Sequence, residues 1–71
     1  MKVHFDEIFS VRRNGIITPR VVVRINGQTM GPGVNFGKGI SFGGVDLEEF
    51  IDSFLEVENQ NGVRVIKGFY N

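Results

Sequence analysis

The clearest hydrophobic pattern in the chain lies between residues 45 and 55, where the sequence reads VDLEEFIDSFL. Apolar side chains recur there at the i, i+3, i+4, i+7 and i+8 spacing that places them on one face of a helix. Asp46 has the short acceptor side chain favoured at a helix N-cap, and Glu49 follows three residues later, as in a capping box. This pattern predicts one short amphipathic helix over about residues 46–55, whose buried face holds Leu47, Phe50, Ile51, Phe54 and Leu55.

Asn-Gly dipeptides stand at residues 14–15, 26–27 and 61–62, each between segments rich in β-branched and apolar residues. Such a dipeptide is the strongest short-range signal for a β-hairpin, because it tolerates the positive φ angles of a type I′ turn. The sequence therefore predicts a single α+β domain over residues 1–71, in which an antiparallel sheet of about five strands is built from these hairpins. We expect the helix to pack on one face of this sheet, because so short a helix does not persist alone.

The first hairpin favours a three-residue loop over residues 13–15, with Gly15 in a left-handed conformation. The cost of this register is Glu7, which falls on the apolar face opposite Val21 unless a bulge near residues 6–8 turns it away. In return, four pairs form one coherent face: Phe9 with Pro19, Val11 with Ile17, Val3 with Ile25 and Phe5 with Val23.

The other two Asn-Gly turns differ in how well they define the register of their strands. A two-residue loop at residues 26–27 returns a short strand over residues 28–30 and sets Met30 beside Val23. At residues 61–62, two-residue and three-residue loops both give acceptable apolar and charge pairs, so that register stays open. The two alternatives pair Val57 either with Ile66 or with Val65.

Residues 31–44 hold six of the ten glycines of the chain. Their spacing does not match a phosphate-binding loop, because only three residues separate Gly33 from Gly37 and a glycine follows Lys38. Apolar residues alternate with others in this segment, so we expect a loosely paired strand or hairpin whose glycines allow bends and close backbone approach. If its larger side chains are exposed, they offer a contact for a ligand or partner through Phe36, Lys38 and Phe42.

Charge is unevenly distributed, although the formal net charge is zero. Residues 1–30 carry five basic and two acidic side chains, whereas residues 31–71 carry three basic and six acidic ones. In the preferred register, the first two strands share a polar face that includes Lys2, His4 and Ser10. The three residues on this face that we expect to contact a polyanion are Arg12, Arg20 and Arg24.

The residue inventory offers little for catalysis or metal binding. Cysteine is absent and His4 is the only histidine, so a two-histidine metal site within one chain is excluded by count. The serines stand in no recognisable nucleophile motif. We therefore expect a protein that is not an enzyme, with no catalytic residue, no metal and no cofactor.

The N-terminal stretch MKVHFDEIF contains two acidic residues and no long apolar run, unlike a signal peptide. The longest purely aliphatic run, at residues 21–23, is far too short to span a bilayer. We expect a cytoplasmic protein without membrane contact.

Three functional hypotheses follow from the sequence. The first is a non-enzymatic interaction or structural module that forms a homo-oligomer, most simply a dimer, or binds another protein. A chain of 71 residues without cysteine has a small core. An edge strand lacks obvious protection, and apolar residues fall on the sheet face opposite the helix, namely Ile8, Val22, Ile66 or Tyr70. The second hypothesis is weak binding of nucleic acid or another polyanion, and the third is a small ligand held between the helix and residues 31–44.

Overall fold

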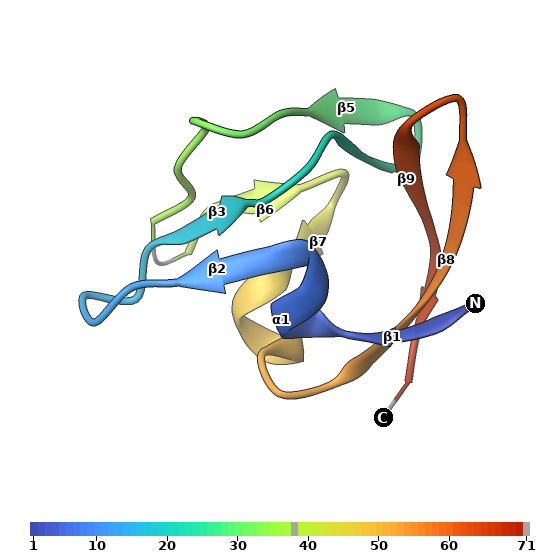
Figure 1. Cartoon of the computed structure of the whole chain (residues 1–71). Helices are drawn as coiled ribbons and strands as arrows, with labels where there is room; N and C mark the ends of the chain where they lie inside the picture. The colour runs from blue at the N-terminus through green and yellow to red at the C-terminus, as the bar shows by residue number, and fades with distance from the viewer. Residues whose placement is uncertain (38, 71) are drawn as a thin grey trace.

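The computed structural model of the chain describes residues 1–37 and 39–70 and confirms an α+β fold (Figure 1). Within these two ranges, helical structure is limited to one turn of α-helix, α1 (Phe5–Ile8), and a 3₁₀ helix, η1 (Leu47–Phe50). The strands are β1 (Lys2–His4), β2 (Phe9–Val11), β3 (Ile17–Pro19), β4 (Val23–Ile25), β5 (Gln28–Met30), β6 (Ser41–Phe42), β7 (Val45–Asp46), β8 (Phe54–Gln60) and β9 (Val63–Phe69).

The main sheet has five strands in the order β1–β8–β9–β4–β5. Neighbouring strands of this sheet are antiparallel except β4 and β9, which run parallel. The expectation of a wholly antiparallel sheet is therefore wrong at this pair. The expected pairing of Val3 with Ile25 is also wrong, because β1 pairs with β8 and sets Val3 opposite Leu55. The reason is α1, which redirects the chain after β1, so that the β2–β3 hairpin forms a small sheet of its own.

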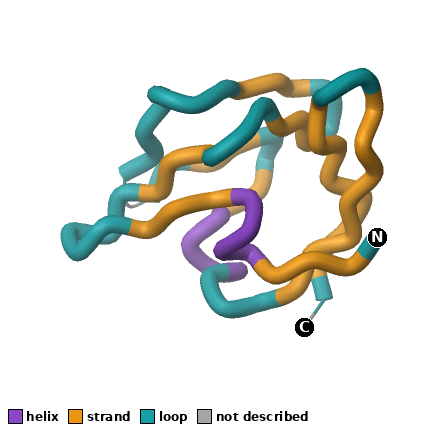
Figure 2. Tube along the Cα trace, viewed as in Figure 1, coloured by secondary structure: helices purple, strands orange, loops and turns teal. Residues whose placement is uncertain are grey.

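A second layer covers the concave side of the curved β8–β9 pair (Figures 1 and 2). It consists of α1, η1 and the two-stranded sheets β2–β3 and β6–β7, and a backbone bridge between Ile17 and Phe36 ties β3 to the glycine-rich segment. The core fills the space between the layers and includes the stacked pairs Phe5–Phe9 and Phe36–Phe42. Its buried members are Val3, Phe5, Ile8, Phe9, Ile17, Val23, Ile25, Phe36, Phe42, Leu47, Leu55, Val57 and Ile66.

The helix predicted over residues 46–55 is much shorter in the structure. Asp46 caps η1 as expected, since its carboxylate accepts a hydrogen bond from the Glu48 amide at 3.1 Å, but the helix ends at Phe50. Asp52 then adopts a left-handed conformation with φ of 71°, which a helix cannot continue through. Phe54 and the residues after it join β8, where they gain strand partners on both sides from β1 and β9.

The Asn-Gly turns form three hairpin loops, two of them in the predicted register. The first hairpin has the three-residue loop, with Gly15 at φ of 84° and Phe9 opposite Pro19. The second is a two-residue loop that sets Met30 opposite Val23. At the third turn, where the sequence left two registers open, the two-residue loop forms, and the pair it creates is Val57 with Ile66.

Glu7 does not face Val21 across a strand pair, and no bulge is needed to turn it away. It lies in α1, where its carboxylate accepts a hydrogen bond from the His4 amide at 2.8 Å. The His4 side chain in turn accepts from the Asp6 amide at 3.2 Å, which completes a capping box. Local helix capping therefore explains a charge that strand periodicity placed in the core.

The glycine-rich segment forms the β6–β7 hairpin, whose turn is held against the β4–β5 hairpin. The Gly43 amide donates to Gln28 Oε1 at 2.7 Å, and Asn26 Nδ2 donates to the Gly43 carbonyl at 2.8 Å. A Cβ atom on Gly43 would lie 2.5 Å from the Ile25 carbonyl oxygen, and its φ is 58°. Glycine therefore allows two backbone segments to approach closely at this point, as the composition predicted.

We predict that Gly43→Ala destabilises the protein by about 2 to 4 kcal/mol, because it adds a backbone clash to the strain of a positive φ. The matched control is Gly15→Ala, which also places alanine at a positive φ, of 84°, but has open space around the added methyl group, so about 1 kcal/mol is expected. Urea titration of the three proteins measures both losses. Equal losses at the two positions would contradict the close approach at Gly43.

Candidate functional site

The outer face of the main sheet carries the most distinctive group of exposed and half-buried side chains. Because Val3 and Leu55 point into the core, their strand neighbours point the opposite way. The side chains of Phe54 and Tyr70 remain 44% and 38% exposed. We call this group the outer face and define it as Lys2, His4, Phe54, Glu56 and Tyr70.

The two aromatic rings of the outer face share one cation. The Tyr70 amide donates to the Phe54 carbonyl at 2.8 Å, which continues the β8–β9 pairing and places the residues side by side. Lys2 Nζ lies 5.0 Å from the centre of the Phe54 ring and 4.6 Å from that of Tyr70. Such contacts contribute about 0.5 to 1 kcal/mol each at exposed sites, so they order the three side chains without covering them.

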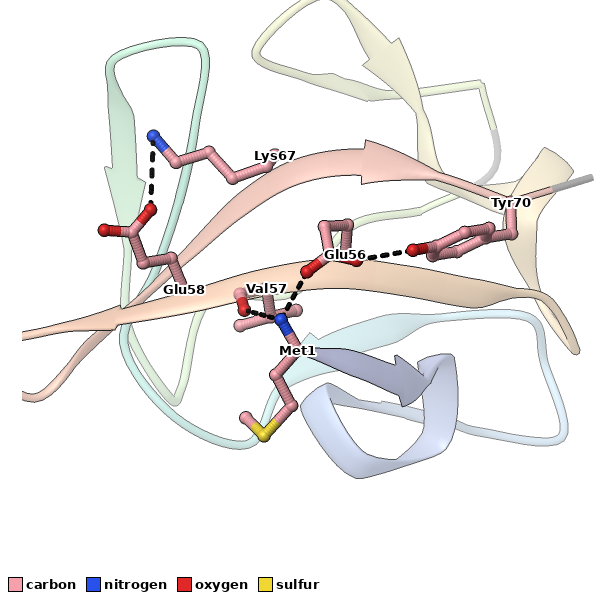
Figure 3. A network of polar contacts seen from close by, with 6 residues as sticks. All are labelled: Met1, Glu56, Val57, Glu58, Lys67 and Tyr70. Carbon is pink, nitrogen blue, oxygen red and sulfur yellow. Dashed lines mark hydrogen bonds and ion pairs between the residues drawn. The ribbon is translucent and has the colours of Figure 1, made fainter.

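Glu56 is the centre of the polar contacts on this face (Figure 3). Its carboxylate accepts hydrogen bonds from the Met1 ammonium group and from the Tyr70 hydroxyl. The same ammonium group donates to the Val57 carbonyl at 2.9 Å. These contacts fix β1 along β8 and orient the Tyr70 ring.

The same hydrogen bonds shift two pKa values in opposite directions. The Met1 ammonium group, and then the Tyr70 hydroxyl, lower the pKa of Glu56 below its ordinary value of 4.5 because both donate to its ionised form. The pKa of Tyr70 is raised above 10.0 because its hydroxyl donates to the Glu56 carboxylate, a bond that the phenolate cannot make.

A cluster of metal-ligating side chains adjoins the outer face where β1 ends. His4, Asp6 and Asp52 each offer one ligand atom, and these atoms lie within 4.8 Å of one another. His4 Nδ1 is 3.6 Å from Asp6 Oδ2, and the imidazole packs edge-on against the Phe54 ring, with 5.1 Å between ring centres. The sequence did not suggest this cluster, because only the pairing of β1 with β8 brings Asp52 to His4.

The three arginines predicted to contact a polyanion occupy separate places. Arg12 adjoins the loop of the β2–β3 hairpin, whereas Arg20 lies at the other end of that hairpin and donates from Nε to the Asp6 and Phe9 carbonyls. Arg24 belongs to the main sheet, where its Nε donates to Thr29 Oγ1 at 3.0 Å. They therefore do not form one stripe along a shared strand pair. Binding of a polyanion stays a prediction, for which loss of heparin retention in the triple change to serine is the test.

The aromatic residues predicted to contact a ligand or partner from the glycine-rich segment are not exposed. Phe36 and Phe42 are 4% and 0% exposed and stack on each other in the core, with 5.3 Å between ring centres. The expectation of exposure is wrong because the β6–β7 hairpin and the Ile17–Phe36 bridge turn both rings inward. Lys38, the third residue of that group, lies outside the described residues.

The second face of the main sheet is less apolar than expected. Of the four residues predicted to lie opposite the helix, Ile8 and Ile66 are buried, and only Val22 and Tyr70 are exposed. Phe54 is also exposed, although the helical spacing of apolar residues 47–55 had assigned it to the buried side of a helix. The alternation of Phe54, Glu56 and Glu58 with buried residues is the strand signal that would have revealed it.

No pocket is found among residues 1–37 and 39–70, so the small-ligand hypothesis gains no cavity between η1 and the glycine-rich segment. None of the described helices has the length and apolar character needed to cross a membrane. The exposed outer face and the adjoining cluster are therefore the features from which a function can be argued.

We predict that Glu56→Gln loses stability relative to the natural chain at pH 7 and that this difference shrinks at about pH 3. A carboxylate whose pKa is lowered on folding stabilises the folded state above the ordinary pKa of 4.5, and the contribution is lost as the pH falls through the lowered value. Urea titration at the two pH values measures the difference. Glu58→Gln is the control, since that exposed carboxylate faces Lys67 at 3.8 Å and accepts from Gln60 Nε2 at 3.1 Å, and contacts neither the Met1 ammonium group nor Tyr70. A pH-independent loss in Glu56→Gln would contradict the pKa shift.

Comparison with known proteins assigns no family to this geometry. No protein-family model matches the chain, and neither a curated protein nor a solved structure shows significant similarity to it.

Proposed function

We propose that this protein is a non-enzymatic interaction module that binds a second copy of itself through the outer face. The observation that carries the proposal is the adjacent pair Phe54 and Tyr70, which stays exposed on a rigid strand pair. Aromatic residues are enriched at protein interfaces, because they bury a large area at a small cost in side-chain entropy. A homodimer is the simplest closed assembly for such a surface.

The charges of the outer face suit pairing with an identical surface. Lys2 and Glu56 lie opposite each other on neighbouring strands, so the face carries both signs at close range. A two-fold axis brings the same patch of both copies together, and Lys2 of one copy can then face Glu56 of the other. The uneven charge of the two halves of the chain is compatible with the same arrangement.

The face, rather than the sheet edge, is the surface that we assign to the contact. The edge strand β1 has only three residues, one of which is a lysine. The His4 amide is already taken by the Glu7 carboxylate at 2.8 Å. Short length, charge and a capped amide all oppose the addition of another strand at an edge.

The proposal includes no catalytic step. The chain has a single histidine and no cysteine, and its described residues enclose no pocket in which a substrate could be held away from water. The alternative to this proposal is that the same surface binds a different protein instead of a second copy. We propose that the module is cytoplasmic. A chain without cysteine needs no disulfide, so it can fold in a reducing compartment.

We predict that the protein is at least dimeric at about 100 µM, well above a micromolar dissociation constant. Light scattering after gel filtration should then report at least twice the chain mass of 7.9 kDa. The double change Phe54→Ser and Tyr70→Ser should give a folded monomer, because it removes the apolar surface that the contact buries.

The matched control is Val11→Ser, which removes an exposed apolar side chain from β2, outside the outer face. This variant should keep the mass of the natural chain. A monomeric natural chain, or a double variant that still dimerises, contradicts self-association through this face.

A further inference from the structure

We propose that His4, Asp6 and Asp52 together bind one divalent transition-metal ion, with zinc as the representative ion, within a single chain. This site shares His4 with the outer face, but all of its ligands come from one chain, so it does not rest on the self-association proposed above. It joins the end of β1 and the start of α1 to the turn between η1 and β8, two regions far apart in the sequence.

The spacing of the donor atoms is close to what a metal requires. Zinc binds imidazole nitrogen and carboxylate oxygen at about 2.0 to 2.2 Å, which puts neighbouring donors of a tetrahedral site about 3.3 Å apart. His4 Nδ1 and Asp6 Oδ2 are 3.6 Å apart. The full set lies within 4.8 Å, so rotation of the exposed Asp6 and Asp52 side chains closes the remaining distance.

His4 is held in place before any metal arrives. Its side chain caps α1, and its ring is fixed edge-on to Phe54, at 89° between the ring planes. Its Nδ1 accepts a long hydrogen bond of 3.2 Å from the Asp6 amide, a contact that an ion bound at this nitrogen replaces, and it lies 3.6 Å from Asp6 Oδ2. The side chain is 31% exposed, which leaves the ring accessible to an ion from solvent.

Asp52 is held by a tight turn that few residues favour. The Ser53 amide donates to the Phe50 carbonyl at 3.0 Å, and Asp52 sits inside this turn with φ of 71°. The Phe5 amide donates to the Ser53 carbonyl at 2.9 Å, which ties the turn directly to α1. An aspartate at a position that usually takes glycine or asparagine keeps its carboxylate beside His4.

The donor set selects a class of metal. One imidazole nitrogen with two carboxylate oxygens suits zinc and its neighbours in the first transition row. Calcium prefers six to eight oxygen ligands and magnesium a regular octahedron of oxygens, so neither is served by this group. Three protein ligands leave one position of a tetrahedral zinc site for water, as the exposure of the cluster allows.

A bound ion acts as a clamp, because it links the end of β1 and the start of α1 to the turn before β8. An ion that binds the folded chain and finds no such arrangement in the unfolded chain stabilises the folded state by mass action. The clamp lies at the end of the β1–β8 pairing, beside the point where Phe54 begins β8.

Isothermal titration of the full chain with zinc chloride tests the proposal. We expect one ion per chain, and no measurable binding of calcium. His4→Asn removes the imidazole but keeps a favoured N-cap residue, and Asp52→Asn removes a carboxylate while it tolerates the left-handed turn. Each variant should weaken zinc binding at least about tenfold, since even the loss of an outer partner of a metal ligand costs that much. Glu49→Gln, on η1 and outside the cluster, should bind like the natural chain.

A second readout separates ligation from folding. Zinc should raise the unfolding temperature of the natural chain and of Glu49→Gln but not that of His4→Asn, with unfolding temperatures compared first in the absence of metal. Failure of the natural chain to bind zinc, unchanged affinity in His4→Asn, or one ion per two chains would each overturn a site within one chain.

Discussion

The antiparallel pairing of β1 with β8 is the contact on which the rest of the structure depends. It places the first residues of the chain against those that follow η1, with Val3 opposite Leu55. Both of these side chains are buried, so the pairing closes one end of the core. A chain of this length has a single small core and a correspondingly small margin of stability, which makes one long-range strand pair important. The outer face and the His4–Asp6–Asp52 cluster are both built across this pairing.

Local signals in the sequence predicted the parts of the fold that depend on neighbouring residues. The Asn-Gly turns form hairpins because their backbone preferences are set by two or three residues, and Gly15 has the left-handed conformation that its loop requires. Asp46 caps a helical turn for the same reason. The close approach at Gly43 was also indicated by composition, although the identity of its neighbour, Ile25, was not.

Long-range competition decided the parts that the sequence could not predict. The residues from Phe50 to Leu55 satisfy a helical period, yet Leu55 and Val57 also alternate with exposed residues as a strand does. The strand forms because β8 pairs with β1 on one side and with β9 on the other. A pattern within a short stretch of sequence does not show which strands will pair with it. The same pairing brings Phe54 to the surface and Asp52 to His4. Alternation along β8 could have shown that Phe54 is exposed, but no spacing in the sequence places Asp52 beside His4. The burial of Phe36 and Phe42 likewise depends on a bridge to Ile17.

The most direct test of the pairing of β1 with β8 is to measure nuclear Overhauser effects between backbone α-protons of the two strands. The β1–β8 register places Lys2 opposite Glu56 and His4 opposite Phe54 in the closely spaced pairs of an antiparallel ladder. We expect strong effects between the α-protons of both pairs. Their absence, together with cross-strand effects between Val3 and Ile25, would show that β1 extends the first hairpin and would contradict the account of the outer face and of the cluster.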